Sequence, residues 1–421
     1  MPITRSITSI PGYFWEEFFG WQILLSWWQA ETNRFNYANL TNMTLKLKQI
    51  LTFFTCLLCA TQVFSQNAQL TILPQIKLPN DSVISKKLIQ SLNQFLTDKN
   101  ESLKSSSVMD SNHYKRYTDF FELFKNVEKS KRYNDDNFFR CYLKNIVLLP
   151  DNSFQVDLSY FGITKSNEIV HRLSISLLAK ETKNNFVFYC PFEQNTKHWK
   201  TTKLDNITFH YQGSLNEAVA KDFEKYNITI ANKLKLQPIQ FDFYNCKDIQ
   251  EVYKVLGIDY DISRNGEVRS GSFDITNKLF IAGTNTDQYK HDLTHGYFSL
   301  KFADSLRNWT AEEGYNIYTT DYWGESTETI FKYLNEYIIK NPTASLYDAF
   351  QKNIILKYPI PIKYPLSAVL IRRVEKEFGF EKVLELISSG ESDDNYFAIL
   401  HKLIGLTKDN FDKIIKEEIK K

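Results

Sequence analysis

Residues 289–299 read YKHDLTHGYFS, and residues 309–318 read WTAEEGYNIY. His291 and His295 are four residues apart, so on a helix the two imidazoles project from one face. Imidazoles one turn apart can both reach a zinc ion at about 2.0–2.1 Å. Asp292 follows the first histidine, at the position where the pattern H-E-x-x-H places a general base. The first stretch therefore predicts a helix that carries two metal ligands and an acid.

Glu313, in the second stretch, lies eighteen residues after His295. A catalytic zinc site needs three protein ligands and one open position. An acid on the helix that follows the histidine helix supplies the third ligand. Taken alone, the adjacent acids Glu312 and Glu313 would also suit a solvated helix start, where negative charge is favourable to the helix dipole.

Together the two stretches resemble the gluzincin metallopeptidases, specifically the bacterial peptidase-MA-like group related to aminopeptidase N and thermolysin. That group carries H-E-x-x-H and, about eighteen residues later, W-x-x-E-G-x-A-x-Y. The resemblance implies a zinc peptidase, a hydrolase in which His291, His295 and Glu313 bind Zn2+ and water attacks a peptide bond. One extra residue separates Trp309 from the Glu-Gly pair in this chain, so Glu312 remains a minor candidate for the third ligand.

Weaker similarity to the same family extends over residues 204–420, about half of the chain. Tyr364, in the sequence YPLSA, matches the tyrosine that stabilises the oxyanion in these peptidases, and packing at a helix start is its alternative role. The resemblance also implies that one strand holds an extended peptide substrate by adding it to the sheet. That strand comprises Leu279, Phe280, Ile281, Ala282 and Gly283.

Asp292 departs from the family pattern, which has Glu at this position. Its carboxylate is one methylene shorter and reaches up to ~1.5 Å less far, and a misplacement of ~1 Å can cost ~100-fold in rate. Three outcomes follow from the shorter side chain. A second water could bridge the gap between Asp292 and the attacking water and leave slow activity, or the helix could lie closer to the metal and compensate. Alternatively, the domain could be a zinc-binding relic used for recognition. We expect a peptidase, with a catalytically weak or inactive gluzincin-fold binding protein as the alternative. The aminopeptidase motif G-x-M-E-N is absent before His291, which favours an endopeptidase or an unassigned preference.

The composition limits the classes of partner that we expect, and the N-terminal region indicates where in the cell the protein acts. With 51 Lys and Arg against 49 Asp and Glu among 421 residues, no nucleic acid or anionic membrane is implied as a partner, and we expect a peptide or protein substrate. Residues 43–65 combine early lysines, a short apolar run and small residues before Gln66, which predicts a signal peptide. The apolar run is shorter than the ~20 residues of a membrane span. We therefore expect a secreted or periplasmic protein without an integral membrane segment in its mature chain, and residues 1–42 as a leader or non-native extension.

The periodicity of the remaining chain predicts an α+β fold. Residues 66–203 read as helices over 82–96 and 117–127 followed by antiparallel strands, typical of a small accessory domain. Surface carbohydrate binding by this sheet is a weaker third hypothesis, based only on aromatic residues. Residues 204–421 begin as alternating strands and helices and then become mostly helical, as expected for a zincin domain with a short sheet. Three cysteines remain after residue 66, which allows one disulfide and one free thiol.

Overall fold

The computed structural model describes residues 70–266 and 270–420. Contacts group Leu70–Lys421 as one compact unit. The expected signal peptide at 43–65 and the segment before it lie outside the described residues. Among the described residues, no helix combines the length and apolar character that a membrane span requires.

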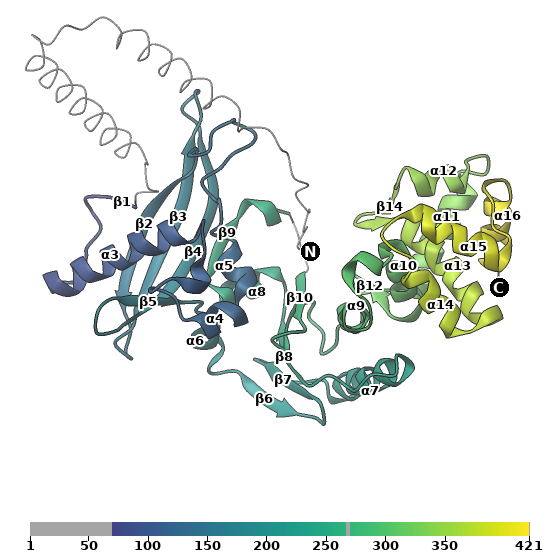
Figure 1. The fold of residues 1–421 in the computed structure, drawn as a ribbon, viewed down its shortest axis with the longest axis horizontal. Helices are drawn as coiled ribbons and strands as arrows, with labels where there is room; N and C mark the ends of the chain where they lie inside the picture. The colour runs from purple at the N-terminus through teal and green to yellow at the C-terminus, as the bar shows by residue number, and fades with distance from the viewer. Residues whose placement is uncertain (1–69, 267–269, 421) are drawn as a thin grey trace, which may run out of the picture. The chain divides into compact units, whose positions relative to one another are not determined.

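The first part of the described chain is a largely antiparallel sheet with helices packed on it (Figure 1). Its longest helix, α3 (Ser82–Asp98), starts at Asp81, whose side chain accepts hydrogen bonds from the backbone amides of Val83 and Ile84. Leu92 and Phe95 on this helix are fully buried, and burial of such side chains stabilises by about 1.5–3 kcal/mol each. The strands are β1 (Thr71–Ile72), β2 (Arg140–Leu148), β3 (Phe154–Ile163), β4 (Ile169–Glu181) and β5 (Phe186–Tyr189), and β9 (Ile258–Asp261) also pairs with β4. The short helices are η3 (Leu103–Ser105), α4 (Ser111–Arg116), α5 (Thr118–Glu122) and α6 (Phe192–Thr196).

The helix expected over 117–127 is shorter than the sequence predicted. Helix α5 ends at Glu122, after which the amides of Phe124 and Lys125 bond to carbonyls three residues back. Asn126 then adopts a positive φ of 53°, which ends any helical continuation. The disulfide that three cysteines would allow is not formed, since Cys141, Cys190 and Cys246 are all free and buried.

The second sheet has the order β10-β11-β8-β7-β6. Its strands are β6 (Lys200–Lys203), β7 (Ile207–Tyr211), β8 (Phe241–Cys246), β10 (Ser270–Asp274) and β11 (Leu279–Gly283), linked by α7 (Glu217–Lys233), α8 (Ile249–Leu256) and η4 (Ile262–Arg264). Strands β7, β8 and β11 run parallel, and the outer strands β6 and β10 are antiparallel to their neighbours. The β-α-β opening expected from residue 204 onward is therefore present.

Both faces of β11, in the second sheet, are buried. Leu279 and Ile281 of β11 pack into the core of the first sheet, whereas Phe280 and Ala282 pack into the core of the C-terminal helices. Coverage on both faces explains why β11 reads as an uninterrupted apolar run. The boundary expected after residue 203 falls within the hairpin of β6 and β7, so the two segments are joined through this sheet.

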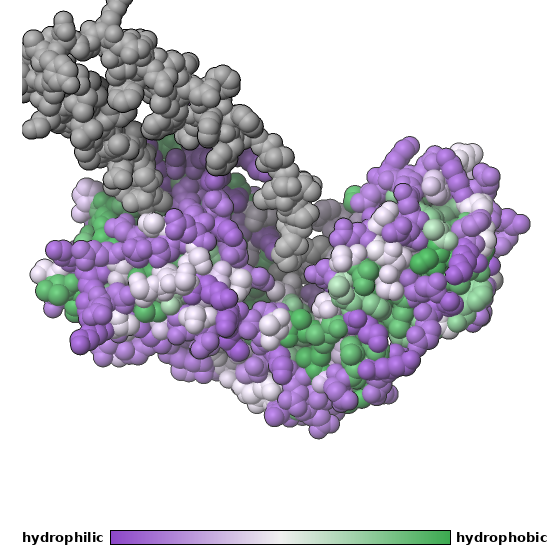
Figure 2. All heavy atoms as spheres, in the orientation of Figure 1, coloured by the Kyte–Doolittle hydropathy of each residue, from purple (hydrophilic) through white to green (hydrophobic). Residues whose placement is uncertain are grey.

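The C-terminal half is mostly helical, as expected. Its elements are α9 (Lys290–Lys301), η5 (Asp304–Leu306), α10 (Trp309–Thr319), β12 (Asp321–Tyr322), β13 (Glu325–Ser326), α11 (Thr327–Lys340), α12 (Leu346–Gln351), β14 (Ile355–Lys357), β15 (Ile360–Pro361), α13 (Lys363–Phe378), α14 (Phe380–Ile387), α15 (Asp393–Ile404) and α16 (Lys408–Glu418). Helices α10 and α13 are in close contact at Gly314, where a Cβ would stand 2.3 Å from the Ser367 hydroxyl oxygen. The face in Figure 2 is mainly hydrophilic, with small hydrophobic areas over the C-terminal half.

Candidate metal centre

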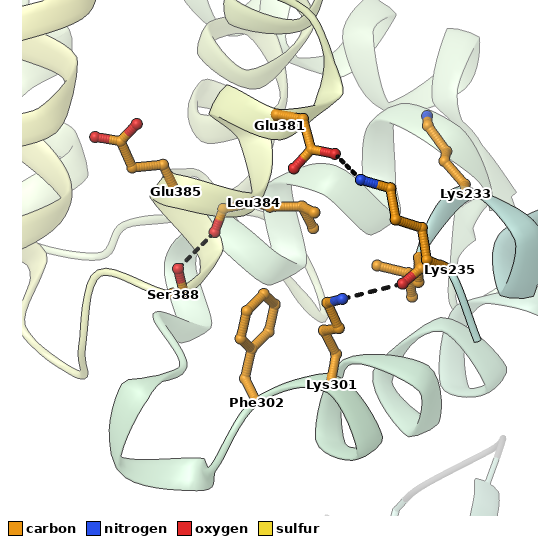
Figure 3. Close-up of a pocket in the computed structure, with 9 residues that line it drawn as sticks. Lys233, Lys235, Lys301, Phe302, Glu381, Leu384, Glu385 and Ser388 are labelled. Carbon is orange, nitrogen blue, oxygen red and sulfur yellow. Dashed lines mark hydrogen bonds and ion pairs between the residues drawn. The ribbon is translucent and has the colours of Figure 1, made fainter.

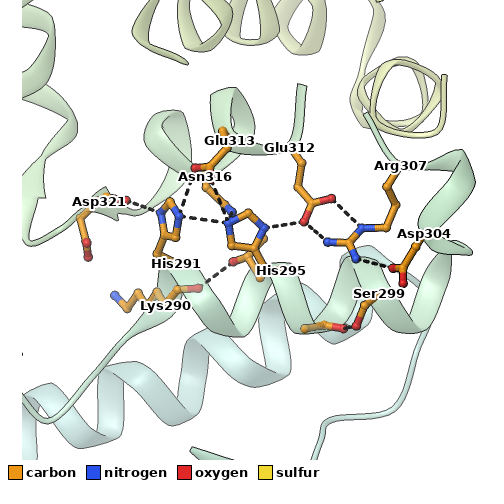
Figure 4. A network of polar contacts seen from close by, with 12 residues as sticks. Lys290, His291, His295, Ser299, Asp304, Arg307, Glu312, Glu313, Asn316 and Asp321 are labelled. Carbon is orange, nitrogen blue, oxygen red and sulfur yellow. Dashed lines mark hydrogen bonds and ion pairs between the residues drawn. The ribbon is translucent and has the colours of Figure 1, made fainter. Parts of the chain in front are cut away.

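Helices α9 and α10 bring the three expected ligands together. The metal-binding atoms of His291, His295 and Glu313 all lie within 4.8 Å of one another. His291 Nε2 is 3.1 Å from His295 Nε2 and 3.3 Å from one Glu313 oxygen, and His295 Nε2 is 3.7 Å from the other oxygen (Figure 4). Ligand atoms that surround zinc tetrahedrally at about 2.0–2.1 Å stand about 3.3–3.4 Å apart. The observed separations bracket that value, so the three side chains fit one metal ion.

Packing fixes both helices that carry these ligands. Leu293 and Phe298 of α9 are fully buried in the helical core. Helix α10 starts at Asn308, whose side-chain oxygen accepts a hydrogen bond from the Ala311 amide. Gly314 lets α13 approach immediately beside Glu313, because any side chain at residue 314 would collide with Ser367.

The Glu313 carboxylate is buried without hydrogen-bond donors. The residue is 0% exposed, and neither of its oxygens has a hydrogen-bond partner. An ionised carboxylate in such surroundings is costly unless a cation faces it. Burial by itself would lower the pKa of His291, but the contacts with Glu313 outweigh this effect and raise the pKa to about 9. The site therefore favours positive charge, as a metal-binding site must.

Both histidines are oriented so that their Nε2 atoms meet at the cluster. His291 Nδ1 donates a hydrogen bond to the Asp321 carbonyl at 2.7 Å. His295 Nδ1 donates to a Glu312 oxygen, and the His295 ring stacks on Trp309 with the planes 6° apart. When Nδ1 carries the proton, Nε2 is left with the lone pair that binds a metal.

Glu312 has a different role from the minor one considered from the sequence. Its carboxylate accepts the His295 hydrogen bond and two from Arg307, one of them from Nε at 2.8 Å. Burial would raise the pKa of this carboxyl, but His295 and Arg307 outweigh that effect and hold it below its usual value. Glu312 thus orients His295, and Glu313 is the acid that lies with the two histidines in the cluster.

Asp292 and Tyr364 are the two expected catalytic residues. Burial raises the pKa of the Asp292 carboxyl, while the nearby histidines act to lower it. Its Oδ2 lies 3.1 Å from the point where a Cβ on Gly271 of β10 would stand, so the strand passes close to this acid. Tyr364 starts α13 and is partly buried, and both burial and the charge of Glu313 raise the pKa of its phenol. Tyr364 therefore experiences the charge of the cluster, as an oxyanion-binding tyrosine would.

The prediction that Leu279–Gly283 holds an extended substrate is wrong, because this strand is not at an edge of the sheet. Strand β11 pairs with β10 on one edge and with β8 on the other, so its backbone has no free edge for a peptide. The edge strand is β10, which begins the second sheet and pairs only with β11 among the described residues. A hairpin through residues 274–279 places β10 at the edge of the sheet, outside β11, which is the strand predicted from the sequence.

A separate hollow lies at the C-terminal end of α9. Its volume is about 330 Å³, and it is lined by Lys233, Leu234, Lys235, Lys301, Phe302, Glu381, Leu384, Glu385 and Ser388 (Figure 3). Its lysines already have partners: Lys233 binds Glu375, Lys235 binds Glu381, and Lys301 donates to the Leu234 carbonyl. The hollow shares no residue with the cluster on α9 and α10.

Some residues of the site were not expected from the sequence. These are Arg307, Asn316, Asp321 and Tyr322, whose ring contacts His291 edge-on at 5.4 Å. The spacing of three residues after Glu313 was a usable signal for Asn316, since residues at i and i+3 share a helix face. Comparison with known proteins finds no matching family model, and no curated protein matches the sequence.

Proposed function

We propose that the chain is a zinc-dependent peptidase that acts outside the cytoplasm. One observation carries the proposal: a buried carboxylate without hydrogen-bond partners faces two imidazole Nε2 atoms at ligand-to-ligand distances. The H-D-x-x-H and Glu-Gly stretches that resemble the gluzincins favour a peptidase over other zinc hydrolases. The pattern at residues 43–65 supports export.

The residues of the chain divide the work of peptide hydrolysis. His291, His295 and Glu313 would hold zinc, which when bound polarises a carbonyl and makes water a stronger nucleophile near neutral pH. Asp292 takes the proton of the attacking water and passes it to the leaving amine, and its raised pKa suits both steps. The Tyr364 phenol donates a hydrogen bond to the oxygen that becomes negative in the transition state.

Strand β10 supplies the binding edge for an extended substrate. A peptide that pairs with Ser270–Asp274 would run past Gly271, beside the Asp292 carboxylate. Backbone pairing holds the peptide without demanding a particular sequence. A side chain at residue 271 would collide with the Tyr289 ring, so the glycine is what lets β10 pass this close to Asp292.

The proposal is tested by metal analysis of the purified chain together with cleavage of a peptide library that has free and blocked amino ends. We expect bound zinc and cleavage in the wild type, and neither in His295→Ala. Asp292→Glu should keep zinc and raise the rate by up to ~100-fold, because it restores the longer reach. A wild type without zinc contradicts the proposal.

The alternative, a catalytically weak or inactive binding protein of the same fold, is favoured by the shorter Asp292. It predicts zinc without turnover in the wild type and turnover in Asp292→Glu. Cleavage of peptides with blocked amino ends would identify an endopeptidase, and cleavage restricted to free amino ends would identify an aminopeptidase.

A further inference from the structure

Asn316 lies one helical turn after Glu313 on α10, and its side chain points toward the same cluster (Figure 4). The residue is 0% exposed. Its Nδ2 donates a hydrogen bond to His295 Nε2 at 3.0 Å, whereas its buried Oδ1 has no hydrogen-bond partner. The gluzincin pattern has Ala at this position, so an amide here is a departure of this chain.

The observed hydrogen bond and a bound metal exclude each other. Asn316 Nδ2 uses the lone pair of His295 Nε2, which is the lone pair that a metal requires. The amide also leaves a buried carbonyl oxygen unpaired, at a cost of about 1–3 kcal/mol that an apolar side chain would avoid. The metal-free arrangement therefore does not account for an asparagine at this position.

A rotation of the Asn316 side-chain amide by 180° about its last torsion accounts for the asparagine and for its unpaired oxygen. It exchanges the two amide atoms, so that Oδ1 takes the place of Nδ2 at 3.0 Å from His295 Nε2. The other ligand atoms of the cluster are separated by 3.1, 3.3 and 3.7 Å. That separation is close to the distances among the other ligand atoms, as expected of an atom that binds the same ion as His295, and amide oxygens are established ligands of divalent cations.

We propose that Asn316 is a fourth protein ligand of the metal and binds it through Oδ1. The inference rests on the proposed metal centre and adds an oxygen donor that the three-ligand pattern lacks. Two imidazoles, a carboxylate and an amide oxygen would then hold the ion and leave a fifth position open for the water that the proposed hydrolysis needs.

Cobalt substitution of the full-length chain tests this ligand without relying on activity. The chain is stripped with a chelator and reloaded with Co2+, whose visible absorption weakens as the number of ligands rises. Zinc affinity is measured in parallel by competition with a chromophoric chelator. The variants are Asn316→Leu, which keeps the branched shape but has no donor atom, Asn316→Ala, which matches the family pattern, and Asn316→Asp, which keeps an oxygen.

We expect stronger cobalt bands in Asn316→Leu and Asn316→Ala and a zinc dissociation constant raised about 10–100-fold. Asn316→Asp should keep the wild-type spectrum and bind zinc at least as tightly. The metal-free melting temperature of Asn316→Leu should not fall, because the substitution removes an unpaired polar group. Spectra and affinities equal to wild type in both donor-free variants would overturn the inference and leave the metal centre intact, whereas a wild type that binds neither ion would overturn both.

Discussion

Among the buried carboxylates of the described residues, Glu128 and Glu313 differ in how the chain meets their charge. Beside the first sheet, Glu128 faces Lys99, with Nζ 2.7 and 2.8 Å from the two carboxylate oxygens and the lysine side chain 0% exposed. In the helical half, the ion-pair partners of Glu313 among the described residues are His291 and His295.

The two carboxylates differ in where the opposite charge comes from. Burial lowers the pKa of Lys99 and Glu128 acts to raise it, and the two groups form an ion pair that is made entirely by the chain. An imidazole carries a charge only when it is protonated, so Glu313 needs either a proton or a metal ion. The first arrangement belongs to a structural core, and the second belongs to a binding site.

The largest expected effect comes from removing a ligand. His295→Ala takes away one imidazole and the stacking partner of Trp309, and we expect peptide cleavage to fall to background. Circular dichroism should show unchanged helix content, because His295 is not part of the apolar core. Cleavage at more than about a hundredth of the wild-type rate would contradict the assignment, since activated water is worth several kcal/mol.

A matched substitution beside the first sheet should lower the free energy of unfolding and leave the zinc content unchanged. Glu128→Gln leaves the Lys99 ammonium buried without its counter-charge, which typically costs about 3–5 kcal/mol. Urea unfolding of the chelator-treated chain measures this loss, and zinc content should match the wild type in the folded fraction. A loss of zinc without a loss of stability would contradict the claim that the Glu128 pair has only a structural role.

The pH dependence of the metal-free chain follows from His291. Its pKa is raised from the ordinary 6.5 to about 9, so protonated His291 stabilises the fold fully below pH about 6.5. This contribution, roughly 3 kcal/mol at most, is lost as the pH rises through about 9. Chelator-treated protein should therefore lose stability over this window, whereas the stabilisation by added zinc should grow, because metal binding needs the neutral imidazole. Unfolding curves at several pH values, with and without zinc, measure both trends. The account is contradicted if the free energy of unfolding changes with pH equally with and without zinc.

The smallest of these effects concerns the residue that orients His295. Glu312→Gln keeps the size of the side chain but weakens the contacts with His295 and Arg307. We expect a loss of zinc affinity of about 10–100-fold in the folded fraction. The metal-free melting temperature should also fall, because Arg307 loses its buried counter-charge and keeps only the exposed Asp304 as an ion-pair partner. An unchanged affinity would show that stacking on Trp309 alone orients the ring.

The clustering of His291, His295 and Glu313 was predictable because it depends on local spacing. The spacing of His291 and His295 needs only a helix, and Glu313 needs only a second helix packed against the first. Helix α3 was predictable for the same reason, since Asp81 and the apolar period mark it in the sequence.

The features that the sequence did not reveal depend on contacts between distant segments. The substrate strand was misplaced because the order of β10 and β11 in the sheet is decided by pairing and not by apolar content. The partners of Glu312 were missed because Arg307 reaches it across the start of α10. The end of α5 depends partly on Asn126, whose amide donates to the distant Asn100 side chain.

The most direct test of the central claim is a zinc titration of the chelator-treated full-length chain at neutral pH, followed by calorimetry. The account predicts about one zinc ion per chain, held by two imidazoles and a carboxylate, and an upward shift of the melting temperature on zinc addition. The same titration of Glu313→Gln should show neither binding nor a shift. A wild-type chain that takes up no zinc and melts at the same temperature with and without it would contradict the account.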